Sequence, residues 1–203
     1  MDKKQAKVAV LVSGGGTNLQ ALIDAEKSGI IKSGRISLVI SNKSDAYALE
    51  RAKNAGIETA VVLKSDFETK AGFEGKIKEL LYEHGIDFIV LAGFMVILSK
   101  EFTSAFPRKI INVHPSLIPS FCGAGFYGLR VHEAALEYGV KVTGATVHFV
   151  NEIPDGGEII MQRAVEIRED ETPETLQRYV MENCEWKILP LSLEKVCSEL
   201  INS

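Results

Sequence analysis

Two polar residues of the segment "INVHPSLIPS" stand two positions apart at the end of an apolar run, directly before a proline. Side chains of a β-strand alternate between its faces, so Asn112 and His114 point the same way if this run is a strand. An amide can donate to a developing oxyanion, and an imidazole can move a proton near neutral pH. The pair therefore suits attack by an amine on a carbonyl-like carbon. Considered alone, His114 fits a satisfied core histidine at least as well.

Asp155, in the turn "IPDGG", is the acid best placed by its surroundings to assist His114. A nearby negative charge favours the imidazolium form of a histidine and raises its pKa. Gly156 and Gly157 would let this turn bend sharply and approach a ligand. Aspartate before glycine is also common in turns that bind nothing, so both interpretations of Asp155 stay open.

The other three histidines fit structural positions better. His84 lies near the end of a predicted helix, where a cation favours the helix dipole, and His132 lies on a predicted helix face. His148, in the alternating "TVHFV", is interpreted as structural. No pair of histidines has metal-ligand spacing, so the sequence predicts no metal site.

Three glycines, Gly14 to Gly16, end an apolar run and open a helical pattern in "VLVSGGGTNLQ". Glycines let backbone N–H groups approach an anion, and a helix N-terminus adds partial positive charge. The loop is not a dinucleotide fingerprint, because Leu19 takes the third glycine position and the next strand ends in Ser41 and Asn42 instead of an acid. A P-loop is excluded because no Gly-Lys-Ser/Thr follows. A small phosphate, as in a phosphoribosyl group, fits better; a tight turn without a ligand is the alternative.

The elements that must position these residues alternate regularly in the first half of the chain. Near-continuous apolar strands separated by helices predict an α/β fold, with a Rossmann-like, mostly parallel twisted sheet flanked by helices. Ligands bind such sheets at the carboxyl ends of the strands, where the glycine loop, residues 93–98 and the Asn112–His114 pair all fall. The predicted strands are 7–13, 35–42, 58–63, 87–94 and 109–114, and the predicted helices are 17–29, 45–56, 69–85 and 98–106.

The second half has a different pattern. Residues 115–128 form a loop rich in proline, glycine and aromatic residues, and 131–139 predict a short helix. Residues 141–150 and 156–167 predict an antiparallel addition joined by "NEIPDGG". A long C-terminal helix is expected to begin with Thr172 as N-cap and Pro173 at its first position; it runs to the end or breaks near Pro190.

Composition limits the classes of protein to consider. The 203 residues are 46% hydrophobic, enough for a sizeable core, and the net charge of −4 gives no basic footprint for a nucleic acid. Cys122, Cys184 and Cys197 form no C-x-x-C pair, which suits reduced thiols in a cytoplasm. Glycines cut the first apolar run without a cleavage site, and no run approaches the ~20 apolar residues of a membrane helix. We therefore expect a cytoplasmic protein with no membrane or nucleic-acid partner.

Taken together, these segments resemble the phosphoribosylglycinamide formyltransferase family. The resemblance runs from "VAVLVSGGGTNLQALI" through "LAGFMVILS", "INVHPSLIPSF" and "VHEAALEYGVKVTGATVHFV" to "IPDGGEIIMQ". The wider group of folate-dependent formyltransferases shares the Asn-x-His-Pro-Ser core and the later aspartate. The "SGGGTNLQ" opening points to the ribonucleotide enzymes within that group.

The resemblance implies transfer of the formyl group of 10-formyltetrahydrofolate, a co-substrate, to the amine of glycinamide ribonucleotide. The products would be formylglycinamide ribonucleotide and tetrahydrofolate, in de novo purine biosynthesis. Asn112 would hold the oxyanion, His114 would pass a proton to the leaving folate nitrogen, and Asp155 would keep His114 basic. One domain, 1–203, is expected, with a nucleotide-phosphate-binding half (1–100) and a catalytic, folate-binding half (101–203). A monomer or a homodimer is expected.

The resemblance also implies two sets of binding residues. For glycinamide ribonucleotide they are Gly16, Thr17, Asn18, Glu182 and Glu185, and for folate they are Lys70, Met95, Val96, Ile97, Leu98, Asn112, Asn151, Glu152, Ile153, Pro154 and Asp155. Three positions depart from the family's pattern. Val96 stands where many relatives have arginine, Lys70 falls near the place of a folate-contacting arginine, and Trp186 replaces the histidine of a Glu-His pair.

Two other functions remain open at this point. A 10-formyltetrahydrofolate hydrolase would use the same Asn112, His114 and Asp155 but pass the formyl group to water. A non-catalytic nucleotide-binding module would use the glycine loop alone, and it would leave those three residues without a reason.

Overall fold

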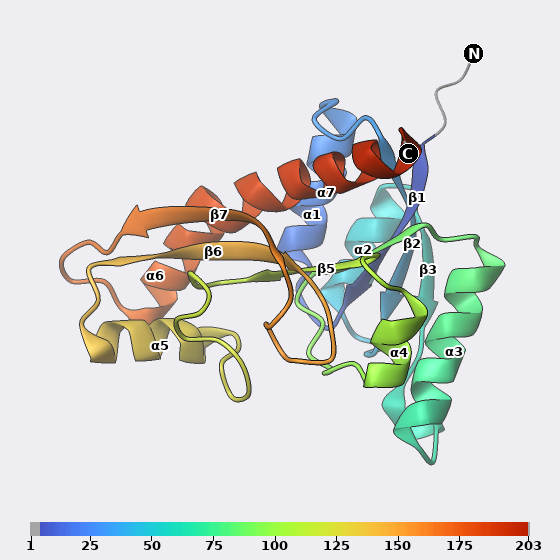
Figure 1. Ribbon diagram of the computed structural model, residues 1–203, viewed down its shortest axis with the longest axis horizontal. Coiled ribbons are helices and arrows are strands. Elements are labelled where there is room, and N and C mark those ends of the chain that lie inside the picture. The colour runs from blue at the N-terminus through green and yellow to red at the C-terminus, as the bar shows by residue number, and fades with distance from the viewer. Residues whose placement is uncertain (1–4, 203) are drawn as a thin grey trace.

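Seven strands form one mixed sheet in the order β3-β2-β1-β4-β5-β6-β7 in the computed structural model, which describes residues 5–202 (Figure 1). β1 to β5 pair in parallel, and β6 and β7 are antiparallel additions beyond β5. The predicted fold class is confirmed. The strands are β1 Ala6–Val12, β2 Gly34–Ser41, β3 Glu58–Val61, β4 Phe88–Leu91, β5 Ile110–His114, β6 Val142–Phe149 and β7 Ile159–Glu166.

The strand order reverses between β1 and β4. β1 lies inside the sheet; β2 and β3 follow on one side of it, and the chain then returns to place β4 and β5 on the other. All four residues of β4 are buried, as expected for a central strand covered on both faces. The carboxyl ends of β1 and β4 therefore border the crevice in which open α/β sheets bind ligands.

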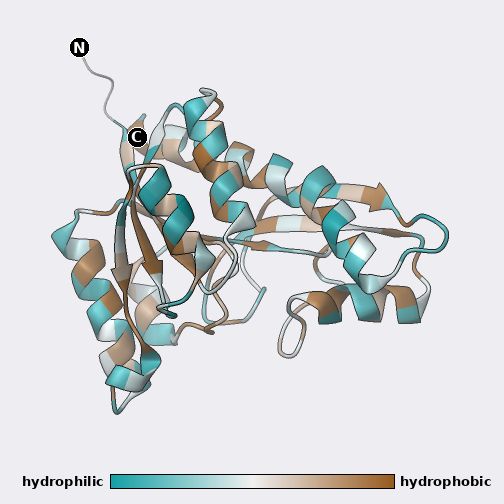
Figure 2. Ribbon diagram, turned by 180° about the vertical axis from the view of Figure 1, so that it is seen from behind, coloured by the Kyte–Doolittle hydropathy of each residue, from teal (hydrophilic) through white to brown (hydrophobic). Residues whose placement is uncertain are grey.

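Helices cover both faces of the sheet and bury two separate apolar cores. The first core joins one face to residues of α1, α2, α6 and α7, and the second joins the other face to α3 and α4. Hydrophobic residues dominate the central strands, whereas the helices carry both hydrophobic and hydrophilic positions (Figure 2). The α-helices are α1 Thr17–Lys27, α2 Tyr47–Asn54, α3 Lys70–Glu83, α4 Lys100–Ala105, α5 Leu129–Tyr138, α6 Pro173–Val180 and α7 Trp186–Ile201.

The C-terminal helical segment is interrupted, but not at Pro190. The helix continues through this proline, and a five-residue π-helical turn, Met181–Glu185, joins α6 to α7 instead. Its cause lies in the buried stripe Leu176, Val180, Cys184 and Ile188, which repeats every four residues. At 3.6 residues per turn, each such step drifts by about 40° around the helix, so a wider turn is needed to return the stripe to the core.

Candidate active site

β5 ends as its sequence predicts, with Asn112 and His114 on one face. In the antiparallel pairing with β6, Asn112 lies directly opposite His148, and His114 lies opposite Thr146. Asn112 Nδ2 is 3.3 Å from His148 Nε2. His114 is 4% exposed and His148 is 2% exposed, so this strand end is shielded from solvent.

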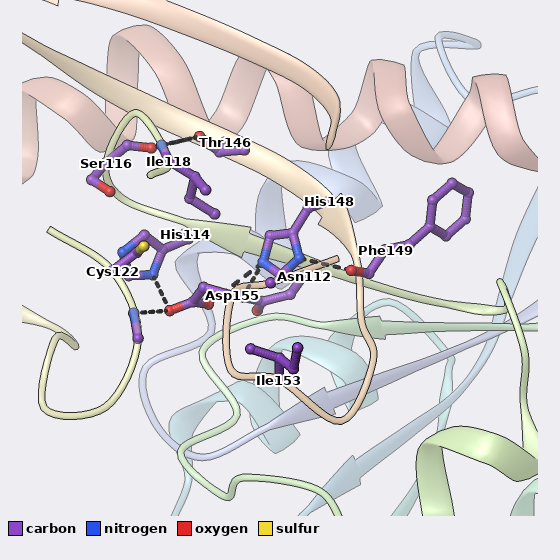
Figure 3. A network of polar contacts seen from close by, with 12 residues as sticks. Asn112, His114, Ser116, Ile118, Cys122, Thr146, His148, Phe149, Ile153 and Asp155 are labelled. Atoms are coloured by element: carbon purple, nitrogen blue, oxygen red, sulfur yellow. Dashed lines mark hydrogen bonds and ion pairs between the residues drawn. The ribbon is translucent and has the colours of Figure 1, made fainter. Parts of the chain in front are cut away.

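Asp155 lies between the two imidazoles (Figure 3). Its Oδ2 is 3.5 Å from His114 Nδ1, and its Oδ1 is 3.5 Å from His148 Nε2. The backbone N–H of Gly123 donates to Oδ2 at 2.9 Å. The residue has a φ of 55°, a left-handed conformation that aspartate tolerates better than most residues. The turn predicted from "IPDGG" therefore delivers its carboxylate to the end of β5.

Backbone carbonyls fix the protonation of both rings. His114 Nε2 is 2.8 Å from the Phe121 carbonyl oxygen, and His148 Nδ1 is 2.8 Å from the Phe149 carbonyl oxygen. A carbonyl oxygen only accepts, so these two nitrogens carry the protons that are donated. The other nitrogen of each ring faces Asp155 and is the one that can gain a proton. The three side chains thus form a continuous proton-handling group beside the Asn112 amide.

Burial is the strongest influence on the charge of His114. It lowers the pKa of the imidazole, while the bond to Phe121 and the charge of Asp155 act in the opposite direction without restoring the usual value. Asp155 therefore raises the pKa as predicted, but the net shift is downward. Burial would raise the pKa of Asp155, but the nearby imidazoles of His148 and His114 and the Gly123 N–H together lower it. An anionic Asp155 beside a neutral His114 is the resting state near neutral pH.

One cavity of about 590 Å³ lies in front of this group. Its size is that of a site for a drug-sized ligand or cofactor. The segment after β4, the loop after β5, the Asp155 turn, α5 and the π-helical turn all contribute to its wall. The lining residues are Asn18, Leu91, Gly93 to Leu98, Asn112 to Pro115, Gly123 to Gly128, His132, His148, Val150 to Asp155, Gln177, Met181 and Glu185.

The segment after β4 is held in place from two sides. The Met95 N–H donates to Ser13 Oγ at 2.9 Å, which joins it to the end of β1. The Ser99 N–H donates to Glu74 Oε1 at 2.8 Å, and Ser99 also caps α4. Glu74 is a buried acid of α3 that also pairs with Lys70 at 3.7 Å. This cavity wall therefore has a rigid backbone with apolar side chains.

A second polar group joins the glycine loop to the π-helical turn. Asn18 Nδ2 donates to Glu185 Oε2 at 2.8 Å, and burial raises the pKa of Glu185 to about 7 despite this bond. Within residues 5–202, Asn18 Oδ1 and both ring nitrogens of His132 are buried without a partner. Unpaired buried polar atoms are costly, so three such atoms in one cavity wall indicate where a polar ligand would bind.

A model of the formyl transferase family matches residues 6–193. The chain belongs to the formyl transferase family. It is 46% identical over 97% of its length to the human trifunctional purine biosynthetic protein adenosine-3, but covers only 19% of that protein. It is 45% identical to phosphoribosylglycinamide formyltransferase of Haemophilus influenzae, with 93% of this chain and 85% of the relative covered. Glycinamide ribonucleotide transformylase 1 of Symbiobacterium toebii has a similar structure, with a TM-score of 0.90, 39% identity, and coverage of 96% and 89% of the two chains.

The formyl transferase fold brings most of the predicted site residues together, but not all of them. Lys70 and Glu182 are exposed and lie outside the cavity wall, and Gly16 and Thr17 lie beside it on the glycine loop. Among residues 5–202, no group of three or more His, Cys, Asp or Glu side chains could hold a metal ion, and no helix is long and apolar enough to cross a membrane. The predicted residues that line the cavity are Asn18, Met95, Val96, Ile97, Leu98, Asn112, His114, Asn151, Glu152, Ile153, Pro154, Asp155 and Glu185.

His148 and His132, for which the sequence predicts structural positions, both lie in the site. His148 contacts both Asn112 and Asp155. His132 is fully buried on α5 and lines the cavity. The alternation of "TVHFV" places His148 on one face of β6, but only the β5–β6 register brings it opposite Asn112.

Proposed function

We propose that this chain transfers the formyl group of 10-formyltetrahydrofolate to the amine of glycinamide ribonucleotide, a step of purine biosynthesis. The observation that carries the proposal is the amide–imidazole–carboxylate group at the end of β5, which opens into a cavity large enough for both reacting groups. The names of relatives that align over nearly the whole chain support the acceptor. The chain spans about a fifth of the trifunctional relatives.

The chemistry needs orientation, oxyanion stabilisation and proton movement. The acceptor amine attacks the formyl carbon while the Asn112 amide donates to the oxygen that becomes negative. The carbon–nitrogen bond to the folate then breaks, the folate nitrogen gains a proton, and the new amide loses one. His114 exchanges these protons, and Asp155 stabilises the imidazolium form that arises in between.

Different parts of the cavity wall would bind the two substrates. Met95 to Leu98 and the turn Asn151 to Asp155 would hold the folate donor between them, with an apolar surface for a flat ring. Asn18, Glu185 and the backbone of Gly16 and Thr17 would hold the ribonucleotide. Lys70 and Glu182, which are exposed and lie outside the cavity wall, remain predicted contacts of the folate and the ribonucleotide, respectively.

The division of the domain into a phosphate-binding half and a catalytic, folate-binding half is part of the proposal, with each half also contributing residues to the other substrate's site. Residues 1–100 supply the glycine loop and one folate wall. Residues 101–203 supply Asn112, His114, Asp155 and Glu185. The Val96 side chain places no charge on the folate wall, so donor binding would rest on ring contacts and backbone groups.

A hydrolase that gives the formyl group to water is the main competing function, because the same three residues would serve it. The hydrogen bond from Asn18 to Glu185 favours transfer, because it forms a second polar group in the cavity wall that could bind an acceptor. Hydrolysis needs no such group. Formate release and formylated glycinamide ribonucleotide should be measured in the same reaction. Formylated glycinamide ribonucleotide that forms only when the amine substrate is added supports transfer. Formate that is released at the same rate with or without the amine substrate contradicts it.

A further inference from the structure

The anion that the acceptor carries has no obvious counter-charge in the cavity. This inference rests on the proposed function, in which the acceptor bears a phosphate. The chain has a net charge of −4, and the cavity wall includes the acids Glu152, Asp155 and Glu185. Among the described residues that line the cavity, none is a lysine or an arginine. A phosphate must therefore be bound by backbone N–H groups or by a cation just outside this wall.

Arg51 of α2 is a cation fixed against the glycine loop. Its Nε–H donates to the Gly15 carbonyl oxygen at 2.8 Å, and its Nη1 donates to Gln20 Oε1 at 3.1 Å. The guanidinium carbon also lies 5.0 Å from the centroid of the Tyr47 ring. These three contacts hold a long side chain that would otherwise have many rotamers.

The N-terminal turn of α2 packs directly on the same loop. The Ala48 N–H donates to the Gly14 carbonyl oxygen at 3.0 Å. A Cβ atom on Gly16, which has a φ of 72°, would lie 2.6 Å from Ala48 Cβ. The loop therefore needs glycine at this position, and Arg51 keeps a fixed distance from it.

These contacts decide the direction of the loop's N–H groups. In a trans peptide, the carbonyl and the following N–H point in opposite directions. Since α2 binds the carbonyls of Gly14 and Gly15, the N–H groups of Gly15 and Gly16 point away from α2. In residues 5–202 neither of these N–H groups has an acceptor, and no side chain caps α1, which begins at the next residue. Successive free N–H groups of this kind bind anions.

We propose that Arg51 is a positioning residue for phosphate recognition. It holds the Gly15 carbonyl against α2, so that the Gly16 N–H is presented to the phosphate, and its guanidinium supplies positive charge beside the loop. The ligand class is a phosphate monoester, and the inference extends the glycine-loop hypothesis to a residue of another helix.

Substrate discrimination tests this role directly. Arg51→Met removes the charge and the hydrogen bonds, whereas Arg51→Lys keeps the charge and loses the Nε–H donor. Lys53→Met is the matched control, because Lys53 lies on the same helix and its ammonium pairs, within residues 5–202, only with Glu50. Each variant is assayed with glycinamide ribonucleotide and with the corresponding riboside, which lacks the phosphate.

For Arg51→Met, kcat/KM for the ribonucleotide should fall by about 10- to 100-fold, mainly through KM, while the riboside should react as it does with the wild type. For the ribonucleotide, kcat/KM of Arg51→Lys should lie between the values of Arg51→Met and the wild type. Lys53→Met should match the wild type. An unchanged ratio between the two substrates in Arg51→Met, whether or not both slow down, would overturn the proposal. If thermal unfolding shows that Arg51→Met does not fold, the same ratio in Arg51→Lys decides the question.

A binding experiment separates this inference from the proposed function. Inorganic phosphate is titrated into the ¹⁵N-labelled protein, and the amide signals of Gly15 and Gly16 are followed. They should shift in the wild type and in Lys53→Met, and at least about tenfold more phosphate should be needed in Arg51→Met. Phosphate binding without formyl transfer would refute the function and leave the role of Arg51 standing. If the wild type transfers the formyl group but Arg51→Met binds phosphate as tightly as the wild type, the proposed function stands and the role of Arg51 is refuted.

Discussion

His148 lies directly opposite Asn112 where β5 pairs with β6, and its Nε2 is 3.3 Å from Asn112 Nδ2. The imidazole is itself fixed by the bond from its Nδ1 to the Phe149 carbonyl oxygen. His148 therefore orients the Asn112 amide. We expect His148→Phe to lower kcat at least about tenfold with little change in KM for either substrate, since one oriented hydrogen bond is lost. A fall in stability alone, with normal kcat in the folded fraction, would contradict this role.

The two residues that end β5 should be the most sensitive to substitution. Asn112→Ala removes the donor to the oxyanion, and His114→Ala removes the proton carrier. Each should lower turnover by at least ~100-fold while the protein stays folded. Single-turnover rates of formyl transfer are the suitable measurement, because they separate chemistry from product release. Near-normal turnover in either variant would show that its assigned role is wrong.

The pH profile should reveal the coupling of Asp155 to His114. Asp155 raises the pKa of His114 against the stronger effect of burial. Asp155→Asn removes that contribution, so the pKa of His114 falls further, and the neutral ring that accepts the first proton persists to a lower pH. We expect a large loss of kcat together with this acid-ward displacement of the acidic limb. A reduced but undisplaced profile would mean that Asp155 does not act through His114.

Glu185 should make stability depend on pH in an unusual direction. Burial raises its pKa to about 7 from an ordinary value of 4.5, so between these values the folded protein holds a proton that the unfolded chain releases. Raising the pH through this window therefore favours unfolding, by at most about 1.4 kcal/mol per pH unit. Glu185→Gln, which keeps an acceptor for Asn18, should match the wild type at pH 5 and unfold at a higher temperature than the wild type at pH 8. Equal unfolding temperatures at both pH values would exclude this effect.

The shape of the Asp155 turn should depend on Gly157. A Cβ atom there would lie 1.7 Å from the Phe149 backbone oxygen, so the turn must shift to accommodate it. We expect Gly157→Ala to lower kcat/KM by about 100-fold, because Asp155 and the folate wall move together. Gly75→Ala is the control, since a Cβ at this open position of α3 meets nothing within 4 Å. The control should keep full activity and gain about 0.5–1 kcal/mol of stability.

Local patterns in the sequence were enough for the strands of the parallel sheet and for the strand-end placement of Asn112 and His114. Alternation along β5 and the proline after it require no long-range information. The position of His148 does require it, because the register between β5 and β6 depends on the path of the chain between them, and the loop 115–128 has no periodicity from which to predict that path. The π-helical turn was also missed: its signal is the four-residue spacing of Leu176, Val180, Cys184 and Ile188, while Pro190 gave a stronger but misleading indication of a break.

The most direct test is a transfer assay with purified protein, 10-formyltetrahydrofolate labelled in the formyl carbon, and glycinamide ribonucleotide. We predict that the label appears in formylglycinamide ribonucleotide, that transfer requires both substrates, and that His114→Ala slows it by at least ~100-fold. Label that appears as formate at the same rate with or without the ribonucleotide would contradict the proposed function, and so would binding of both substrates without any loss of the formyl group.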